Sequence, residues 1–120
     1  MSIDVYGLDK CSTCDKARKW LARHAVEHRF IDYREQRVPA QTLLHWAQAV
    51  GGFDKLVNRS GMTWRNLAPA RKDPRTDAEW TLLIKEYPAL VRRPVVVSAD
   101  GGISLGFSDK LFARLFGVAK

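Results

Sequence analysis

No apolar run in this sequence approaches the length of a membrane span. A transmembrane helix needs about 20 consecutive apolar residues, and every apolar stretch of the 120-residue chain is interrupted far sooner. The opening MSIDVYGLDK also lacks the charged leader, long apolar segment and small-residue cleavage site of an export signal. We therefore expect a cytoplasmic protein with no membrane partner.

The sequence also lacks long runs of one charge, internal repeats and low-complexity linkers. Lys and Arg total 20 against 13 Asp and Glu, which gives a net charge of +7, but many basic residues stand beside acids, as in RKDPRTD. This pattern favours a solvated, mildly basic surface and small anionic ligands over direct nucleic-acid binding. With 46% apolar residues, the chain suffices for one core, so we expect a single domain over residues 1–120.

The first third of the chain has a strand, helix, strand pattern. Residues 3–8, IDVYGL, alternate in polarity and favour a strand. Apolar residues then recur at helical spacing from Ala17 on, with Ser12 or Thr13 expected to cap the helix. Residues 28–34, HRFIDYR, favour a second strand, and this order is typical of a parallel pair.

The middle of the chain, residues 35–87, is predicted to be a helical insert. Pro39 suits the first turn of a helix that continues to Gly51. Short turns and helical pieces are expected next, and Thr76 and Glu79 have the spacing of a capping box.

The last third changes to a strand, strand, helix pattern. Residues 95–99 and 103–107 favour a β-hairpin around a glycine loop, and Ser108 is placed to cap a final helix. We therefore predict the α/β class and a thioredoxin-like fold, with a mixed four-stranded sheet built from β-α-β and then β-β-α. The predicted core comprises residues 1–34 and 88–120.

The chain has only two cysteines, Cys11 and Cys14, in a Cys-x-x-Cys at the start of the first predicted helix. Free backbone N–H groups and the positive end of a helix dipole stabilise a thiolate, which lowers its pKa. Cys11 is placed for this effect and is the predicted nucleophile, while Cys14, one turn later, is close enough to act as the resolving thiol.

Two other interpretations of the cysteines compete with the redox one. His24 and His28 follow in a superficial Cys2His2 order, but a helical rise of about 1.5 Å per residue puts His24 roughly 15 Å along the axis from Cys14, too far for one zinc ion. Both cysteines can also be inert packed side chains. We expect the motif to lie off the apolar helix face, which favours reactive cysteines.

Three stretches of the chain carry a family resemblance: VYGLDKCSTCDKARKWL, LVNRSGMTWRNL and YPALVRRPVVV. Their order and spacing resemble those of the ArsC-type arsenate reductases and their Spx and YffB-like relatives, and the likeness covers nearly the whole chain. The stretch from Arg59 to Arg65 is most similar to the YffB-like branch. The resemblance implies a thioredoxin-like core with a helical insert.

The resemblance also implies roles for particular residues. Cys11 matches the nucleophile, Arg59 and Arg93 match arginines that hold an anionic substrate, and Pro94 matches a proline that is usually cis. No bound cofactor or metal is implied. Glutathione is the implied cosubstrate, and glutaredoxin is an implied partner.

This chain departs from the family pattern at two places. A third arginine would fall in SLGFSD, where the chain has Gly106 and Phe107. Single-cysteine arsenate reductases have a small hydroxyl residue where this chain has Cys14.

These features predict a glutathione-dependent thiol-disulfide oxidoreductase. One alternative is a redox-sensing transcriptional regulator resembling Spx, which binds RNA polymerase; the GMTWRNL stretch follows the reductase-like branch instead. A second alternative is a true arsenate reductase that uses glutathione and glutaredoxin.

Overall fold

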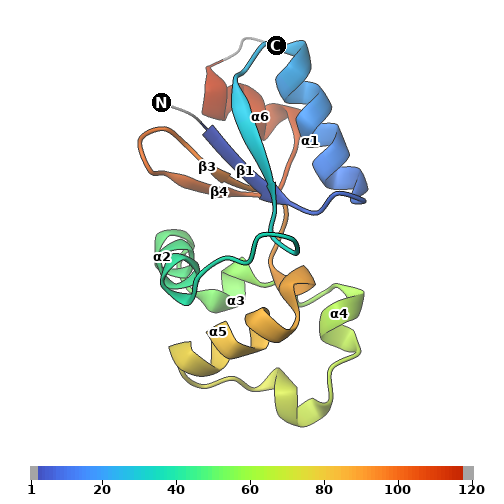
Figure 1. The fold of residues 1–120 in the computed structure, drawn as a ribbon, viewed down its shortest axis with the longest axis vertical. Coiled ribbons are helices and arrows are strands. Elements are labelled where there is room, and N and C mark those ends of the chain that lie inside the picture. Colours follow the sequence, from blue (N-terminus) through green and yellow to red (C-terminus); the bar gives the residue numbers. More distant parts are fainter. Residues whose placement is uncertain (1–2, 118–120) are drawn as a thin grey trace. The chain divides into compact units, whose positions relative to one another are not determined.

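The computed structural model describes residues 3–117, and these fall into two compact units (Figure 1). One unit contains the residues up to Asp32 together with those from Arg93 onward, and the other is Tyr33–Arg92. The first unit contains the sheet and two helices, whereas the second has only helices and one isolated β-bridge among its described elements. No helix within residues 3–117 is both long and apolar enough to cross a membrane.

The first unit is a mixed four-stranded sheet with the strand order β2-β1-β3-β4. Its elements are β1 (Ile3–Gly7), α1 (Ser12–Arg23), β2 (His28–Asp32), β3 (Val95–Val97), β4 (Ile103–Leu105) and α6 (Asp109–Phe116). Strand β1 is parallel to β2 and antiparallel to β3, and β3 is antiparallel to β4. The predicted α/β class and β-α-β, β-β-α order are therefore confirmed.

The core of this unit lies where α1 and α6 pack on the sheet. Val5 and Val96 pair across β1 and β3, so their side chains lie on one face of the sheet. Trp20 of α1 and Phe112 of α6 pack in the same cluster, with their rings edge to face and 5.5 Å between centroids. All four side chains are almost completely buried, and this packing fixes α1 against the sheet.

Both hairpin strands are shorter than predicted: β3 ends at Val97 because the turn begins earlier, and β4 ends at Leu105, before Gly106 at φ 82°. The Ser98 N–H donates to the Gly102 carbonyl at 2.9 Å, and the Gly101 N–H donates to the Ser98 carbonyl at 2.9 Å. Ser108 caps α6 as expected, since its hydroxyl accepts from the Leu111 N–H at 3.0 Å.

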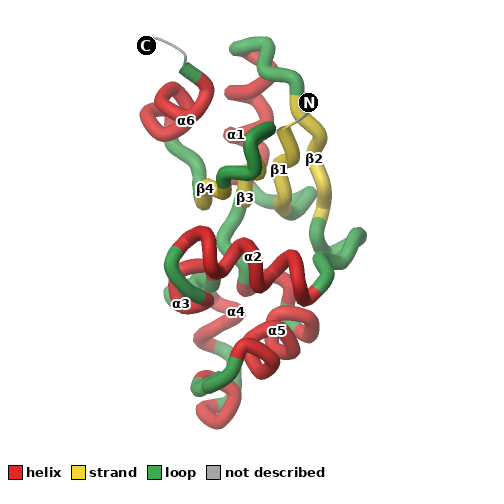
Figure 2. Tube along the Cα trace, turned by 90° about the vertical axis from the view of Figure 1, so that its left-hand side faces the viewer, coloured by secondary structure: helices red, strands yellow, loops and turns green. Residues whose placement is uncertain are grey.

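The second unit consists of α2 (Ala40–Val50), α3 (Phe53–Leu56), α4 (Met62–Arg65), η1 (Pro69–Lys72), α5 (Asp77–Glu86) and η2 (Pro88–Leu90), coloured by type in Figure 2. Pro39 is the N-cap of α2 with an extended backbone, so the prediction that it lies in the first turn is wrong by one position. Gly51 ends α2 as predicted, in the left-handed region at φ 102°, which glycine adopts without strain.

Hydrogen bonds around Val91 join segments of this unit that are far apart in the sequence. The buried Tyr33 hydroxyl donates to the Val91 carbonyl at 2.9 Å. Val57 and Val91 form an isolated antiparallel bridge, and the Arg92 N–H donates to the Leu56 carbonyl at 2.9 Å. The segment after α3 is therefore tied to the chain that leads back into the sheet.

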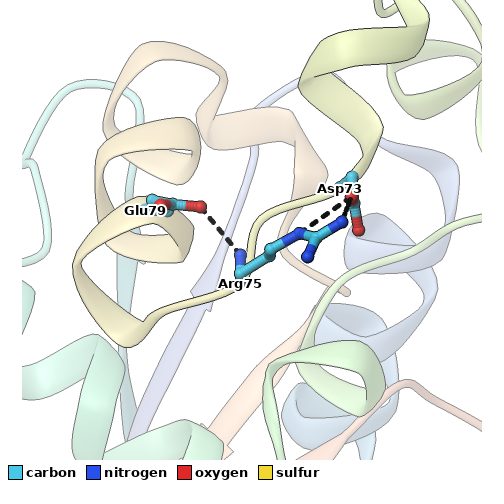
Figure 3. Close-up of polar contacts among 3 residues, drawn as sticks. All are labelled: Asp73, Arg75 and Glu79. Atoms are coloured by element: carbon cyan, nitrogen blue, oxygen red, sulfur yellow. Dashed lines mark hydrogen bonds and ion pairs between the residues drawn. The ribbon is translucent and has the colours of Figure 1, made fainter.

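Helix α5 begins with a modified capping box. The Thr76 hydroxyl accepts from the Glu79 N–H at 3.1 Å, as the spacing predicts. The Glu79 carboxylate, however, accepts from the N–H of Arg75 at 2.8 Å, one residue before the cap (Figure 3). The Arg75 guanidinium also forms an ion pair with Asp73 at 2.9 Å. Both the backbone N–H and the side chain of Arg75 are therefore bound to carboxylates.

We expect the Thr76→Ala substitution to lower the free energy of unfolding by about 1 kcal/mol, because it leaves a helix N–H without its acceptor. Thr76→Ser keeps the oxygen and should cost much less. Chemical denaturation of the two variants and the parent checks this. Equal losses in both variants would contradict the assigned cap.

Candidate active site at the start of helix α1

Cys11 is the N-cap residue of α1. Its backbone is extended, with φ −131° and ψ 122°, and its carbonyl accepts the first helical hydrogen bond from the Asp15 N–H at 2.9 Å. The expectation that Ser12 or Thr13 caps the helix is wrong, because α1 already begins at Ser12. The Cys11 side chain therefore lies at the N-terminus of α1, where the N–H groups of the first turn have no acceptor within the helix.

The Arg93 guanidinium, from the second chain segment of the same unit, places a positive charge next to the Cys11 sulfur. Its Nε donates to the Cys11 Sγ at 3.3 Å, although 82 residues separate the two in the sequence. The following Arg93–Pro94 peptide bond is cis, as the resemblance implies, and Pro94 is fully buried. The carbonyl of Pro94 accepts from the Gly106 N–H at 2.9 Å.

The surroundings of Cys11 lower its pKa below the usual value for a thiol. Partial burial of Cys11 alone would raise the pKa, since it removes water from the charged form. The backbone N–H of Cys14, the Arg93 guanidinium and the Cys14 thiol outweigh this effect. The Cys11 side chain remains partly exposed, so an ionised nucleophile there is accessible to a reactant.

Cys14 lies in the opposite environment. Its side chain is 1% exposed, and this burial raises its pKa to about 11. The backbone N–H of Leu8 partly opposes the shift, while the negative charge of the Cys11 thiolate adds to it. The expectation that both cysteines lie off the apolar face is therefore wrong for Cys14. It shares helical spacing with Ala17 and Leu21, both buried, and that spacing is the signal in the sequence.

Gly7, which the sequence analysis did not single out, leaves the space that the Cys14 sulfur fills. A Cβ at Gly7 would lie 2.5 Å from the Cys14 Sγ and 3.2 Å from Cε1 of Phe30. The first distance is too short for two heavy atoms, so only glycine allows this approach of α1 to β1. A glycine at the end of a predicted strand is the available sequence signal.

Arg59 belongs to the other compact unit, whereas Cys11, Cys14, Arg93 and Pro94 belong to the sheet unit. Arg59 is exposed, and its guanidinium carbon lies 5.5 Å from the ring centroid of Trp64. Trp64 is itself held in an aromatic stack, 6.1 Å from Trp80, which in turn lies 5.7 Å from Phe53. Within residues 3–117, the Arg59 guanidinium forms no hydrogen bond or ion pair, so its N–H donors are available to solvent or a ligand.

The position at which the resemblance implies a third arginine has a different role here. Phe107 packs edge to face against Phe112, with 4.7 Å between ring centroids, in the core of the sheet unit. Gly106 adopts a left-handed conformation at φ 82°. Neither residue supplies a positive charge.

The histidines considered as zinc ligands have other contacts. The His24 ring lies 4.0 Å from the Trp20 ring, and the His28 Nδ1 lies 2.9 Å from the Val26 carbonyl oxygen. Within residues 3–117, no group of three or more His, Cys, Asp or Glu side chains is arranged to hold a metal ion.

We expect Arg93→Gln to raise the pKa of Cys11, because it removes the charge that favours the thiolate. In a Cys14→Ser background, where Cys11 is the only thiol, thiolate absorbance at 240 nm against pH measures this shift. Arg92→Gln is the matched control, since its Nε donates to the Lys55 carbonyl. An unchanged titration in Arg93→Gln, or an equal change in the control, would contradict the assigned contact.

Comparison with known proteins identifies the family of the chain. The ArsC family model matches residues 6–115. An uncharacterised Haemophilus influenzae protein is 37% identical over 114 residues, covering 95% of this chain and 98% of that protein. The solved structure of the YFFB protein has a TM-score of 0.84 and 32% identity, covering 94% of this chain and 97% of its own. Global transcriptional regulator Spx 1 of Lactococcus lactis is 29% identical over 110 residues, covering 89% of this chain and 83% of that protein. The chain therefore belongs to the ArsC family.

Proposed function

We propose that this protein is a thiol-disulfide oxidoreductase that uses glutathione as cosubstrate and the Cys11 thiolate as nucleophile. The observation that carries the proposal is the hydrogen bond from Arg93 to the partly exposed Cys11 sulfur, together with the lowered pKa of Cys11. A lowered pKa increases the thiolate fraction of Cys11, and the thiolate rather than the neutral thiol attacks disulfide sulfur.

The first step exchanges one disulfide for another. The Cys11 thiolate attacks the glutathione sulfur of a mixed disulfide R–S–S–G, forming Cys11–S–S–G and releasing R–S⁻, which takes a proton from water. A second glutathione thiolate then attacks the glutathione sulfur of Cys11–S–S–G. It forms oxidised glutathione and restores the Cys11 thiolate, so the net reaction is R–S–S–G + GSH → R–SH + GSSG.

Cys14 offers a second route for resolution. Its raised pKa keeps it a neutral thiol at neutral pH, so it must lose its proton as it attacks Cys11–S–S–G. The products are glutathione and a Cys11–Cys14 disulfide, which two further glutathione molecules or a reduced glutaredoxin return to the dithiol. Because burial raises the pKa of Cys14, its thiolate forms less readily than that of free glutathione. We therefore favour free glutathione as the main resolving thiol.

Arginine side chains suit the anionic part of such a substrate. Glutathione carries two carboxylates, and a guanidinium forks onto a carboxylate with two hydrogen bonds. We assign substrate binding to Arg93 and Arg59 and assign Pro94 to the wall of the site. Arg59 suits this role because its guanidinium lies over the Trp64 ring with no acid partner in the described chain.

Arsenate reduction is a weaker proposal for this chain. A tetrahedral oxyanion needs several positive charges around it, and Phe107 packs in the core at the place of the implied third arginine.

The proposal that the protein is a transcriptional regulator draws its support from the likeness to Spx 1, which covers 89% of this chain. It predicts that RNA polymerase is retained on the immobilised protein and that turnover is absent.

We expect Cys11→Ser to abolish the reduction of a glutathionylated peptide, by at least 100-fold, because it removes the nucleophile. Cys14→Ser should keep most of the activity if glutathione resolves the intermediate. NADPH consumption coupled through glutathione reductase measures both, and mass spectrometry of Cys14→Ser should detect Cys11 with one glutathione attached.

Two results would contradict the reductase proposal. One is turnover that persists in Cys11→Ser. The other is absent turnover in the parent protein together with retention of RNA polymerase, which supports the regulator instead. Arsenite formation from arsenate, faster than peptide reduction, would support the arsenate reductase alternative.

We expect Arg59→Gln to raise KM for the glutathionylated peptide by about fivefold with little change in kcat, which is the scale of an exposed ion pair. Arg75→Gln is a matched control in the same unit, since Arg75 is paired with Asp73 on the surface. Initial rates over a range of peptide concentrations separate KM from kcat. An unchanged KM in Arg59→Gln would remove Arg59 from the proposed binding site.

A further inference from the structure

The helical unit contains a pocket of about 270 Å³ whose lining residues all belong to Tyr33–Arg92. It is lined by residues of α2 between positions 40 and 46, residues of α5 between positions 81 and 85, and the flanking segments 33–39 and 88–91. Figure 2 shows α2 and α5 as neighbouring helices of this unit. The proposed redox chemistry uses none of these residues.

The floor of this pocket is apolar and buried. Leu43 and Trp46 of α2, Ile84 of α5, and Val91 are each 3% exposed or less. Tyr33 also lines it, but its hydroxyl already donates to the Val91 carbonyl. A ligand body therefore meets aliphatic groups and aromatic rings here.

The rim of the pocket is positively charged. Arg37 and Lys85 line it and are both exposed, and the lining contains no aspartate or glutamate. Within residues 3–117, neither side chain forms a hydrogen bond or ion pair. The nearest acid in sequence to Lys85 is Glu86, which is held by Arg71 through bonds of 2.7 and 3.2 Å.

An apolar floor below two unpaired cations is complementary to a small amphiphilic anion. The pocket volume of about 270 Å³ suits a small ligand with one or two rings. Burial of such a ring on Trp46 supplies affinity, and a carboxylate between Arg37 and Lys85 supplies orientation.

We propose that this pocket is a binding site for a small apolar carboxylate, whose ring system packs on Leu43, Trp46 and Ile84 and whose carboxylate lies between Arg37 and Lys85. This site is distinct from Cys11, so its occupancy does not depend on the reductase proposal.

Two ligands that differ only in charge test this assignment. Naphthalene-2-carboxylate and naphthalene-2-carboxamide have the same ring system, and ¹H–¹⁵N correlation spectra of the full chain report where each one binds. We expect the carboxylate to shift the amides of Leu43, Trp46 and Ile84, with a dissociation constant of about 1 mM or below. The carboxamide should bind about fivefold more weakly or worse.

Charge-neutralised variants separate this pocket from the general positive charge of the protein. Arg37→Gln/Lys85→Gln should bring the carboxylate down to the affinity of the carboxamide. Lys55→Gln/Arg75→Gln removes the same charge from exposed positions of the same unit outside the pocket lining, and should change neither affinity.

Three results would overturn the proposal: no localised shifts at 10 mM carboxylate, equal binding of the two ligands by the parent protein, or equal weakening in the two double variants. Each readout measures ligand binding and not redox activity. A negative binding result therefore leaves the reductase proposal intact, and absent reductase activity leaves the proposed carboxylate site intact.

Discussion

The hydrogen bond between Arg93 and the Cys11 sulfur is the interaction on which the functional account depends. It exists because β3 pairs with β1 in antiparallel register, Tyr6 opposite Val95. In an antiparallel pair, the chain that leaves one strand lies beside the chain that enters the other. The loop after β1 therefore meets the residues before β3, and an arginine 82 positions away in sequence reaches the first cysteine.

The same local structure gives the two cysteines opposite acid strengths. Cys11 is the N-cap residue of α1, next to the backbone N–H groups of the first helical turn, where a negative charge is favoured. Cys14, one turn later, points into the packed layer between α1 and β1, at a point where Gly7 leaves room for its sulfur. One sulfur is thus prepared for attack, and the other is kept neutral beside it.

Much of this arrangement is predictable from sequence, because it depends on periodicity and local spacing. The order of strands and helices along the chain, the first helix at the Cys-x-x-Cys and the Ser108 cap all follow from short-range patterns. The burial of Cys14 is also predictable, because position 14 has the helical spacing of Ala17 and Leu21 even though Cys11 of the same motif is partly exposed. The contact of Arg93 with Cys11 depends on strand pairing across the chain. The family resemblance implies only that Arg93 holds an anionic substrate.

The role of Gly7 was not predictable from local sequence, since it depends on how closely α1 approaches β1. The pocket lined by Arg37 and Lys85 is not predictable from local sequence either. Its lining comes from four separate segments, and no single segment has a pattern that indicates a cavity. Arg37 and Lys85 look like ordinary surface cations in the sequence, and only their position around a buried tryptophan distinguishes them.

The separate titration of the two sulfurs tests the central claim most directly. The ¹³Cβ chemical shifts of both cysteines, followed against pH in the reduced protein, report each ionisation at its own site. The account predicts that Cys11 titrates below the ordinary value for a thiol and that Cys14 titrates at about 11. Two coincident titrations near 8.5, the unperturbed value, or ionisation of Cys14 before Cys11, would contradict it.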